Sequence, residues 1–335
     1  MGNEVIKVKD LKTYFYLSTG IAKAVDGVSF SINKGETLGI VGESGSGKSV
    51  TASSIMRLVP KPIGKIVGGE ILFEGKDLLN LKEKEMLNIR GKEISMIFQD
   101  PMTSLDPVFT IGQQIMEVIK IHQNVTEEEA RKIAIEALNL VGIPEAEKRL
   151  NSYPHEFSGG MRQRVIIAMA IVCKPKMIIA DEPTTALDVT VQAQVLDLLK
   201  DLQRQLGTSI LMITHNLGVV WDICDRVMVM YAGRTVEYAD TKTLYTRPLH
   251  PYTWGLLNSI PKLSDDPNNP LTAIEGAPPD LKLTGEACNF HNRCPYAKDI
   301  CRKKVPELME IEEGHFAACH FQTKTESLDM KGDEW

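Results

Sequence analysis

The sequence has 335 residues, of which 43% are hydrophobic and 24% are charged, and its formal net charge is −6. This length and composition supply enough apolar side chains for a large core and a further small region. The longest apolar stretch, near Val165 to Cys173, is far shorter than the roughly 20 residues of a membrane-spanning helix, and the negative charge gives no reason to expect a nucleic-acid partner.

The amino-terminal part of the chain shows no targeting segment and one aromatic cluster. Met1–Val5 has neither the basic region nor the apolar core of a secretory signal, so we expect none. Tyr14, Phe15 and Tyr16 follow one another a short distance along the chain. Aromatic residues favour β-strands, where they most often pack in the core or cover the sheet surface. We therefore expect these residues to belong to a strand.

The segment from Leu38 to Ser49 carries a phosphate-binding motif. The apolar run Leu38–Val41 is followed by Gly42–Ser49, an unbroken match to the pattern G-x-x-x-x-G-K-S/T. Glycines allow successive backbone N–H groups to point into one concave nest, and the helix that follows offers its positive N-terminus. Lys48 adds a positive charge, and the Ser49 hydroxyl is left to hold Mg²⁺. The segment therefore predicts a P-loop that binds a nucleotide.

The next part of the chain combines an apolar run with a helical pattern. Gln99 follows the apolar run Ile94–Phe98. From Ile111 to Leu140 the apolar residues recur at helical spacing, and Thr126–Glu129 places acids in a first helical turn, where they complement the helix dipole. We therefore expect helices between Ile111 and Leu140.

Two further apolar runs end in residues suited to catalysis. Lys176–Ala180 has the composition of a buried parallel strand and is followed by Asp181 and Glu182, and Ser209–Thr214 is followed by His215. In a doubly wound sheet, ligands collect beyond the carboxyl ends of the strands, so the carboxylates would face Mg²⁺ and the γ-phosphate. A histidine at such a strand end can sense the γ-phosphate, and it can equally serve only to cap or solvate the strand.

Six motifs in this order resemble those of the ATP-binding subunits of ABC transporters, over about residues 10 to 240. Besides the P-loop and the acidic strand, the matching segments are Gln99 for the Q-loop, Ser158–Gly160 for the signature loop, Thr185–Asp188 for the D-loop and His215 for the switch histidine. The resemblance implies an α/β fold with a P-loop NTPase core, an antiparallel β subdomain and a helical insert. It also implies an ATPase whose hydrolysis is coupled to transport.

The resemblance implies a role for each matching residue. Lys48 would clamp the β- and γ-phosphates, and Ser49, Gln99 and Asp181 would hold Mg²⁺. Glu182 would polarise the attacking water, and His215 would brace the γ-phosphate, so that Glu182, His215 and Gln99 form the catalytic set. Phe15 would stack on adenine because Asp10-Leu11 resembles the lead-in to the A-loop aromatic. The remaining ATP-binding residues implied are Gly42, Ser44, Gly45, Gly47 and Val50.

The signature loop would act on a nucleotide bound to another chain. In the family, two such domains sandwich two ATP molecules, and each P-loop faces the partner's signature loop. The residues that would act in this way are Ser158, Gly159, Gly160 and Gln163, and Asp188 would belong to the D-loop. Phe157 and Met161 depart from the leucine and glutamine that the family more often has. The Ser-Gly-Gly that would meet phosphate is intact.

The carboxyl-terminal part suggests the transported substrate. Arg247–Thr253, followed by Leu256-Leu257 and Ser259–Pro261, resembles the C-terminal extension of oligopeptide and dipeptide importer ATPases. We therefore expect an ABC nucleotide-binding domain over residues 1–245, with a helical insert at about 105–165, and a peptide-importer-type extension over 246–335. Two alternatives remain open: a nickel-import ABC ATPase, and a soluble ABC ATPase with a metal-stapled docking tail.

Four of the six cysteines lie in this extension, at positions 288, 294, 301 and 319. In a cytosolic protein such clustering favours metal over disulfide. Five, six and seventeen residues separate successive cysteines, which fits neither a simple zinc knuckle nor the standard ferredoxin patterns. Peptide-importer ATPases with this pattern are associated with a 4Fe-4S iron-sulfur cluster, so the resemblance implies that Cys288, Cys294, Cys301 and Cys319 hold one. Zinc, with His291, His315 or His320 as a further ligand, is the alternative.

The resemblance also implies an assembly. We expect a second ABC ATPase subunit, as a heterodimer or a homodimer, together with two transmembrane permease subunits and an extracytoplasmic peptide-binding protein. The chain would then lie at the cytoplasmic face of the cell membrane as a peripheral protein.

Overall fold

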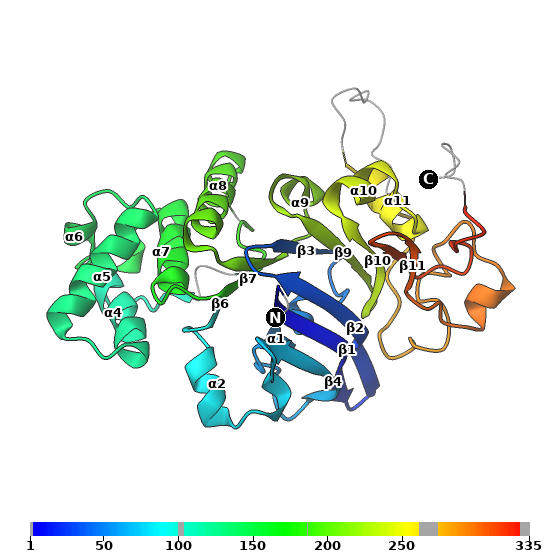
Figure 1. Ribbon diagram of the computed structural model, residues 1–335, viewed down its shortest axis with the longest axis horizontal. Helices are drawn as coiled ribbons and strands as arrows, with labels where there is room; N and C mark the ends of the chain where they lie inside the picture. Colours follow the sequence, from blue (N-terminus) through cyan, green and yellow to red (C-terminus); the bar gives the residue numbers. More distant parts are fainter. Residues whose placement is uncertain (1–2, 100–103, 186, 261–273, 329–335) are drawn as a thin grey trace. The chain divides into compact units, whose positions relative to one another are not determined.

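The computed structural model describes residues 3–99, 104–185, 187–260 and 274–328, which form two compact units (Figure 1). The first unit consists mainly of Asn80–Ile213, with Ile32–Thr37 and the residues up to Val5. The second unit consists of Ile6–Ser31, Leu38–Leu79 and the part of the chain after Ile213. Each unit has its own strands and helices.

The first unit contains three parallel strands in the order β8-β7-β6. Their bounds are β6 (Ile94–Ile97), β7 (Met177–Asp181) and β8 (Ser209–Ile213). Every residue of β7 and β8 is buried, because parallel strands are covered on both faces and therefore consist of continuous apolar runs. The prediction that these runs are buried parallel strands is confirmed.

Helices make up the rest of the first unit, and Figure 1 shows α4 to α7 grouped together beside β6. They are α2 (Glu83–Ile89), α4 (Ile111–His122), α5 (Glu127–Leu140), α6 (Ala146–Arg149), α7 (Gly159–Ile171) and α8 (Val189–Leu206). Thr110 and Thr126 each begin a helix with a capping box, in which the hydroxyl accepts from the N3 backbone N–H. The prediction of helices between Ile111 and Leu140 is confirmed.

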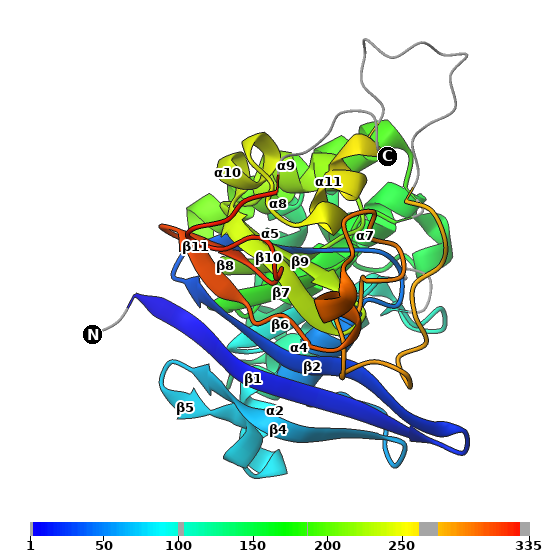
Figure 2. The same ribbon diagram turned by 90° about the vertical axis from the view of Figure 1, so that its right-hand side faces the viewer.

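An antiparallel sheet forms one layer of the second unit, and its strands lie side by side in Figure 2. The order is β2-β1-β4-β5, with bounds β1 (Glu4–Leu17), β2 (Gly20–Asn33), β4 (Gly64–Phe73) and β5 (Lys76–Asp77). The aromatic cluster lies near the end of β1, as predicted, and Phe15 pairs with Gly64 of β4.

The second unit also contains the strands β11-β12-β10-β9-β3 in that order. Their bounds are β3 (Thr37–Val41), β9 (Arg226–Tyr231), β10 (Arg234–Asp240), β11 (Met309–Glu312) and β12 (His315–Ala317). β3 and β9 are parallel, and the other neighbours are antiparallel. The fully buried β3 leads into the glycine-rich loop and then into α1 (Lys48–Ile55).

Three more helices complete the second unit: α9 (Leu217–Ile223), α10 (Thr241–Thr246) and α11 (Pro251–Asn258). Between residue 274 and β11 the described chain is irregular, apart from one 3-10 turn at Asp299–Arg302. Within the described residues, every helix is too short or too polar to cross a bilayer.

Candidate functional site

The glycine-rich loop of the second unit has a backbone that only glycine accommodates easily. Gly42 and Gly47 have φ values of 148° and 104°, in the region that side chains with a Cβ rarely occupy. A Cβ at Gly47 would also collide with the carbonyl oxygen of Ala24, and one at Gly42 with that of Met230. The loop backbone therefore lies so close to β2 and β9 that only glycine fits at these two positions.

The polar groups of the loop suit an anionic ligand. Lys48 is buried, and its Nζ donates to the carbonyl oxygens of Gly42 (2.7 Å) and Glu43 (2.9 Å). The Ser46 Oγ is buried, and among the described residues it has no hydrogen-bond partner. Ser44, Gly45 and Ser49 are exposed and Val50 is half-buried. The loop therefore offers donors and one buried cation to a phosphate group.

His215 lies beside the strand that enters this loop. The Thr214 N–H donates to the Ile40 carbonyl at 3.2 Å, and Ile40 belongs to β3. His215 itself is exposed. The second unit thus brings the predicted P-loop and switch histidine to the same end of β3.

The acidic residues predicted for catalysis end β7 in the first unit. Asp181 is the last residue of the strand and is 5% exposed. Glu182 has a φ of 48°, a strained value for a side chain with a Cβ. Its Oε2 accepts from Gln99 Nε2 (3.0 Å) and from Thr185 Oγ1 (2.9 Å). The side chains of Gln99 and Thr185, which belong to the predicted Q-loop and D-loop, therefore hold the carboxylate of Glu182.

The signature and D-loop residues begin two helices of the first unit. Ser158 caps α7 and accepts from the Met161 N–H at 3.3 Å, and Asp188 caps α8. A Cβ at Gly160 would lie 2.6 Å from a methyl carbon of Val191 in α8. The Gln163 side chain is 1% exposed, and Gly159 begins α7. Ala186 of the predicted D-loop lies outside the described residues.

The three amino-terminal aromatic residues lie in different environments. Phe15 is half-buried against Gly64, whereas Tyr16 is 41% exposed and has the Lys65 ammonium 5.1 Å from its ring centroid. Tyr14 donates from its hydroxyl to Asp26 at 2.6 Å. The pKa of Tyr14 is raised by burial and by this contact with Asp26. Tyr14 is therefore fixed, while the rings of Phe15 and Tyr16 are partly open to a ligand.

The prediction of a metal centre at the carboxyl-terminal cysteines is wrong, for the iron-sulfur cluster and for zinc. Within residues 3–99, 104–185, 187–260 and 274–328, no three His, Cys, Asp or Glu side chains are placed so that they could hold a metal ion. The cysteines are free thiols that line a cavity of about 20 Å³. Burial raises the pKa of Cys288 to about 11 and that of Cys294 to about 12, so both thiols are protonated in the metal-free chain.

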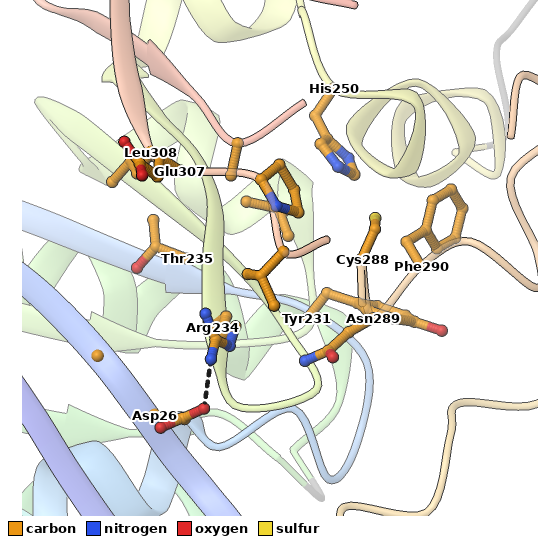
Figure 3. Close-up of a pocket in the computed structure, with 15 residues that line it drawn as sticks. Asp26, Tyr231, Arg234, Thr235, His250, Cys288, Asn289, Phe290, Glu307 and Leu308 are labelled. Carbon is orange, nitrogen blue, oxygen red and sulfur yellow. Dashed lines mark hydrogen bonds and ion pairs between the residues drawn. The ribbon is translucent and has the colours of Figure 1, made fainter. Parts of the chain in front are cut away.

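A larger cavity of about 360 Å³ lies in the second unit beside β10. Figure 3 shows Arg234 directed at Asp26, on the side of the cavity away from Phe290, with an Nη2 to Oδ2 distance of 2.6 Å. Burial favours a higher pKa for Asp26, but the hydrogen bond from Tyr14 and the Arg234 cation outweigh it and lower the pKa. The lowered pKa keeps Asp26 ionised, so this wall of the cavity carries an ion pair between Asp26 and Arg234.

Sequence reasoning missed a set of contacts on the P-loop. The guanidinium of Arg293 contacts the Glu43 carboxylate at 2.6 and 3.0 Å, and the Tyr252 hydroxyl accepts from the Glu43 N–H at 2.9 Å. These residues lie 250 and 209 positions from Glu43 in the sequence. No motif predicts a pair so far apart, although Tyr252 belongs to the Arg247–Thr253 segment that suggested the extension.

Comparison with known proteins places the chain in a family. Residues 25–185 match the family described as "ABC transporter", and residues 236–301 match "Oligopeptide/dipeptide transporter, C-terminal region". The chain is 54% identical to a probable peptide ABC transporter ATP-binding protein of Sinorhizobium fredii, over 94% of each chain. It is 55% identical to the oligopeptide transport ATP-binding protein OppD of Bacillus subtilis, over 93% of this chain and 87% of that protein.

A solved structure supports the cassette fold. The ATP-binding cassette MJ0796, in a dimeric post-hydrolysis state bound to ADP and phosphate, is 29% identical and has a TM-score of 0.63. The similarity covers 70% of this chain and 98% of the cassette. It supports the α/β cassette and gives no support to a cysteine-rich C-terminal extension. The chain therefore belongs to the ABC transporter family, as an ATPase of the oligopeptide and dipeptide branch that couples ATP hydrolysis to transport.

Proposed function

We propose that the chain is the ATP-hydrolysing subunit that powers the import of dipeptides or oligopeptides through a membrane ABC transporter. The main support for this function is the sequence identity of 54% and 55%, over more than nine tenths of the chain, with two proteins named for peptide transport. The match of residues 236–301 to an oligopeptide and dipeptide transporter region favours peptides over nickel. It also disfavours a soluble ATPase that acts outside transport.

The residues of the glycine-rich loop fit the triphosphate of ATP with Mg²⁺. We assign phosphate binding to Lys48 and the loop backbone, with Ser46 Oγ as a further polar group, because these groups are buried at the start of a helix. Gly42, Ser44, Gly45, Gly47 and Val50 would complete the loop, and Phe15 would stack on the adenine. Mg²⁺, when bound, would neutralise charge on the phosphates, and Ser49, Gln99 and Asp181 would hold it.

Glu182 would act as the base that orients and polarises the attacking water. Phosphoryl transfer to water needs mainly positioning and charge stabilisation. The two hydrogen bonds from Gln99 and Thr185 fix the direction of the Glu182 carboxylate, which supports this role. His215 would brace the γ-phosphate. Ser158, Gly159, Gly160 and Gln163, with Asp188, would serve the nucleotide of a second ATPase chain.

The chain is one component of a peptide importer that also contains permeases and a substrate-binding protein. We propose that it pairs with a second ATPase subunit, as a heterodimer or homodimer, and that it lies at the cytoplasmic face of the membrane. The dimeric form of the MJ0796 cassette supports such pairing. We also propose that residues 1–245 form the nucleotide-binding domain, with a helical insert at about 105–165, and that residues 246–335 form an extension.

The function is tested by uptake of a labelled tripeptide and of radioactive nickel in cells that lack the chromosomal copy of the gene. Restoring the wild-type chain should restore peptide uptake without changing nickel uptake. The Glu182→Gln variant should be expressed but should not restore uptake. Restored nickel uptake with no effect on peptides would overturn the proposed substrate class.

A further inference from the structure

Glu43, the second residue of the P-loop, is held by contacts on three sides. Its N–H donates to the Tyr252 hydroxyl at 2.9 Å, and its carboxylate accepts from Arg293 at 2.6 and 3.0 Å. Its carbonyl oxygen accepts from the Lys48 Nζ at 2.9 Å and from the Ser46 N–H at 3.2 Å. Glu43 therefore links the carboxyl-terminal residues Tyr252 and Arg293 to the lysine that contacts phosphate in a P-loop.

Arg293 uses its whole guanidinium in these contacts. Besides the two bonds to Glu43, Nη1 donates to the Tyr231 hydroxyl (3.3 Å), Nη2 to the Ile274 carbonyl (3.0 Å) and Nε to the Glu275 carbonyl (2.9 Å). An arginine has five N–H donors, so five bonds satisfy all of them. The Arg293 side chain is 4% exposed and that of Glu43 is 30% exposed. The pair is therefore a largely buried contact with a single orientation.

The position of the Tyr252 hydroxyl is equally well defined. His250 caps α11, with Nδ1 accepting from the Tyr252 N–H at 3.1 Å. Tyr252 is fully buried and packs edge-on against Tyr231, with 4.6 Å between ring centroids, and against Phe290 at 5.4 Å. Buried Glu237 accepts from the backbone N–H groups of Leu249 and His250 at 2.7 and 2.8 Å, which fixes the start of this helix.

Packing alone does not account for these polar contacts. A buried ion pair adds little to stability over apolar side chains of similar volume, because the desolvation of two charges offsets their attraction. The aromatic cluster of Tyr231, Tyr252 and Phe290 already supplies apolar contact between the carboxyl-terminal region and β9. A buried guanidinium whose donors all form hydrogen bonds is instead held, with its partners, in one orientation. What it orients here is a residue of the P-loop.

We propose that Arg293 and Tyr252 are positioning residues for ATP binding, which hold Glu43 so that Lys48 and the loop N–H groups are set in place before the nucleotide arrives. The carboxyl-terminal region thereby determines the affinity for ATP. This inference rests on the proposed role of the P-loop in ATP binding and deepens it. Because Arg293 and Tyr252 act through Glu43, they should affect nucleotide affinity more than the rate of the chemical step.

The test measures ATP affinity by calorimetry on the full-length chain, and kcat and KM for ATP in the assembled transporter. In Arg293→Gln, we expect ATP affinity to fall about tenfold or more, because a charge-assisted bidentate contact is lost, with a matching rise in KM and little change in kcat. Arg293→Lys should recover part of the affinity. Arg302→Gln, an exposed arginine of the same region, is the matched control and should bind ATP like the wild type.

A double-mutant cycle makes the test specific. Glu43→Gln and Arg293→Gln should be non-additive, so that the second substitution changes affinity much less when the first is present. Tyr252→Phe removes only the hydroxyl and should weaken ATP binding a fewfold, which gives a second measurement if Arg293→Gln fails to fold. Wild-type affinity in folded Arg293→Gln, or in Tyr252→Phe if that arginine variant does not fold, would overturn the inference. Absence of ATP binding by the wild type would instead overturn the proposed function.

Discussion

The loop after β3 and the end of β7 present polar groups in different ways. After β3, Gly42 and Gly47 hold the loop in a backbone conformation that side chains with a Cβ rarely adopt, and buried Lys48 supplies the cation. After β7, the groups are side chains, and the Glu182 carboxylate is fixed by Gln99 and Thr185. A substitution after β3 therefore changes geometry, whereas a substitution after β7 can change chemistry with the geometry intact.

This difference also explains what each region is suited to do. Backbone donors and one lysine are suited to binding a substrate that carries many negative charges. A single oriented carboxylate is suited to moving or polarising one water molecule. Substitutions after β3 should therefore change ATP binding, whereas substitutions after β7 should change hydrolysis.

Glu182→Gln should give the largest effect on turnover. The substitution keeps the size of the side chain and removes its basicity, so we expect kcat for ATP hydrolysis in the assembled transporter to fall about 10²- to 10⁴-fold. ATP affinity should stay within about twofold, because the P-loop backbone is untouched. Glu136→Gln, an exposed glutamate of α5, is the matched control. A kcat close to that of the wild type would contradict the assigned role of Glu182.

Gly47→Ala should abolish measurable ATP binding through geometry alone. The new Cβ would collide with the Ala24 carbonyl in a backbone with φ of 104°, so the loop must move. Gly45→Ala separates strain from collision, because Gly45 has φ of 78° but open space around its Cβ position. Strain alone costs about 1–3 kcal/mol. We expect Gly45→Ala to retain some ATP binding by calorimetry, and equal loss in both variants would count against the steric argument.

Contiguous motifs could be predicted from the sequence, whereas contacts between distant residues could not. The P-loop and the acidic strand end were predictable because each is a contiguous motif whose function follows from local order. Thr185 is three residues from Glu182, yet its contact depends on the turn between them. Arg293 and Glu43 meet only after the second unit has folded, so no local pattern could reveal them.

The carboxyl-terminal cysteines, in contrast, formed a sequence pattern that predicted a site absent from the described residues. Their proximity in sequence, together with a family resemblance, suggested a metal centre at Cys288, Cys294, Cys301 and Cys319. Metal binding needs deprotonated donors with specific directions. The described residues contain no group of three or more His, Cys, Asp or Glu side chains that could hold a metal ion. Proximity in sequence therefore did not establish coordination geometry.

His250 should make stability depend on pH. Burial lowers its pKa to about 3, against an ordinary value of about 6.5. The unfolded chain therefore binds this proton more readily, so the contribution of His250 to the free energy of unfolding should be constant above pH 6.5 and fall below it, by up to about 1.4 kcal/mol per pH unit. Denaturant unfolding between pH 5 and pH 8 measures the effect. His250→Asn keeps an N-cap acceptor without titrating, and an unchanged pH slope in this variant would contradict the prediction.

Thr185→Val should have the smallest effect and tests how the carboxylate after β7 is held. The substitution preserves shape but removes the 2.9 Å hydrogen bond to Glu182 Oε2, leaving the one from Gln99. A hydrogen bond to a charged group contributes about 1.5 kcal/mol or more, so we expect kcat to fall about tenfold with KM for ATP unchanged. Thr185→Ser, which retains the hydroxyl, should stay near the wild type. If valine and serine behave alike, the Thr185 hydroxyl is not needed to orient Glu182.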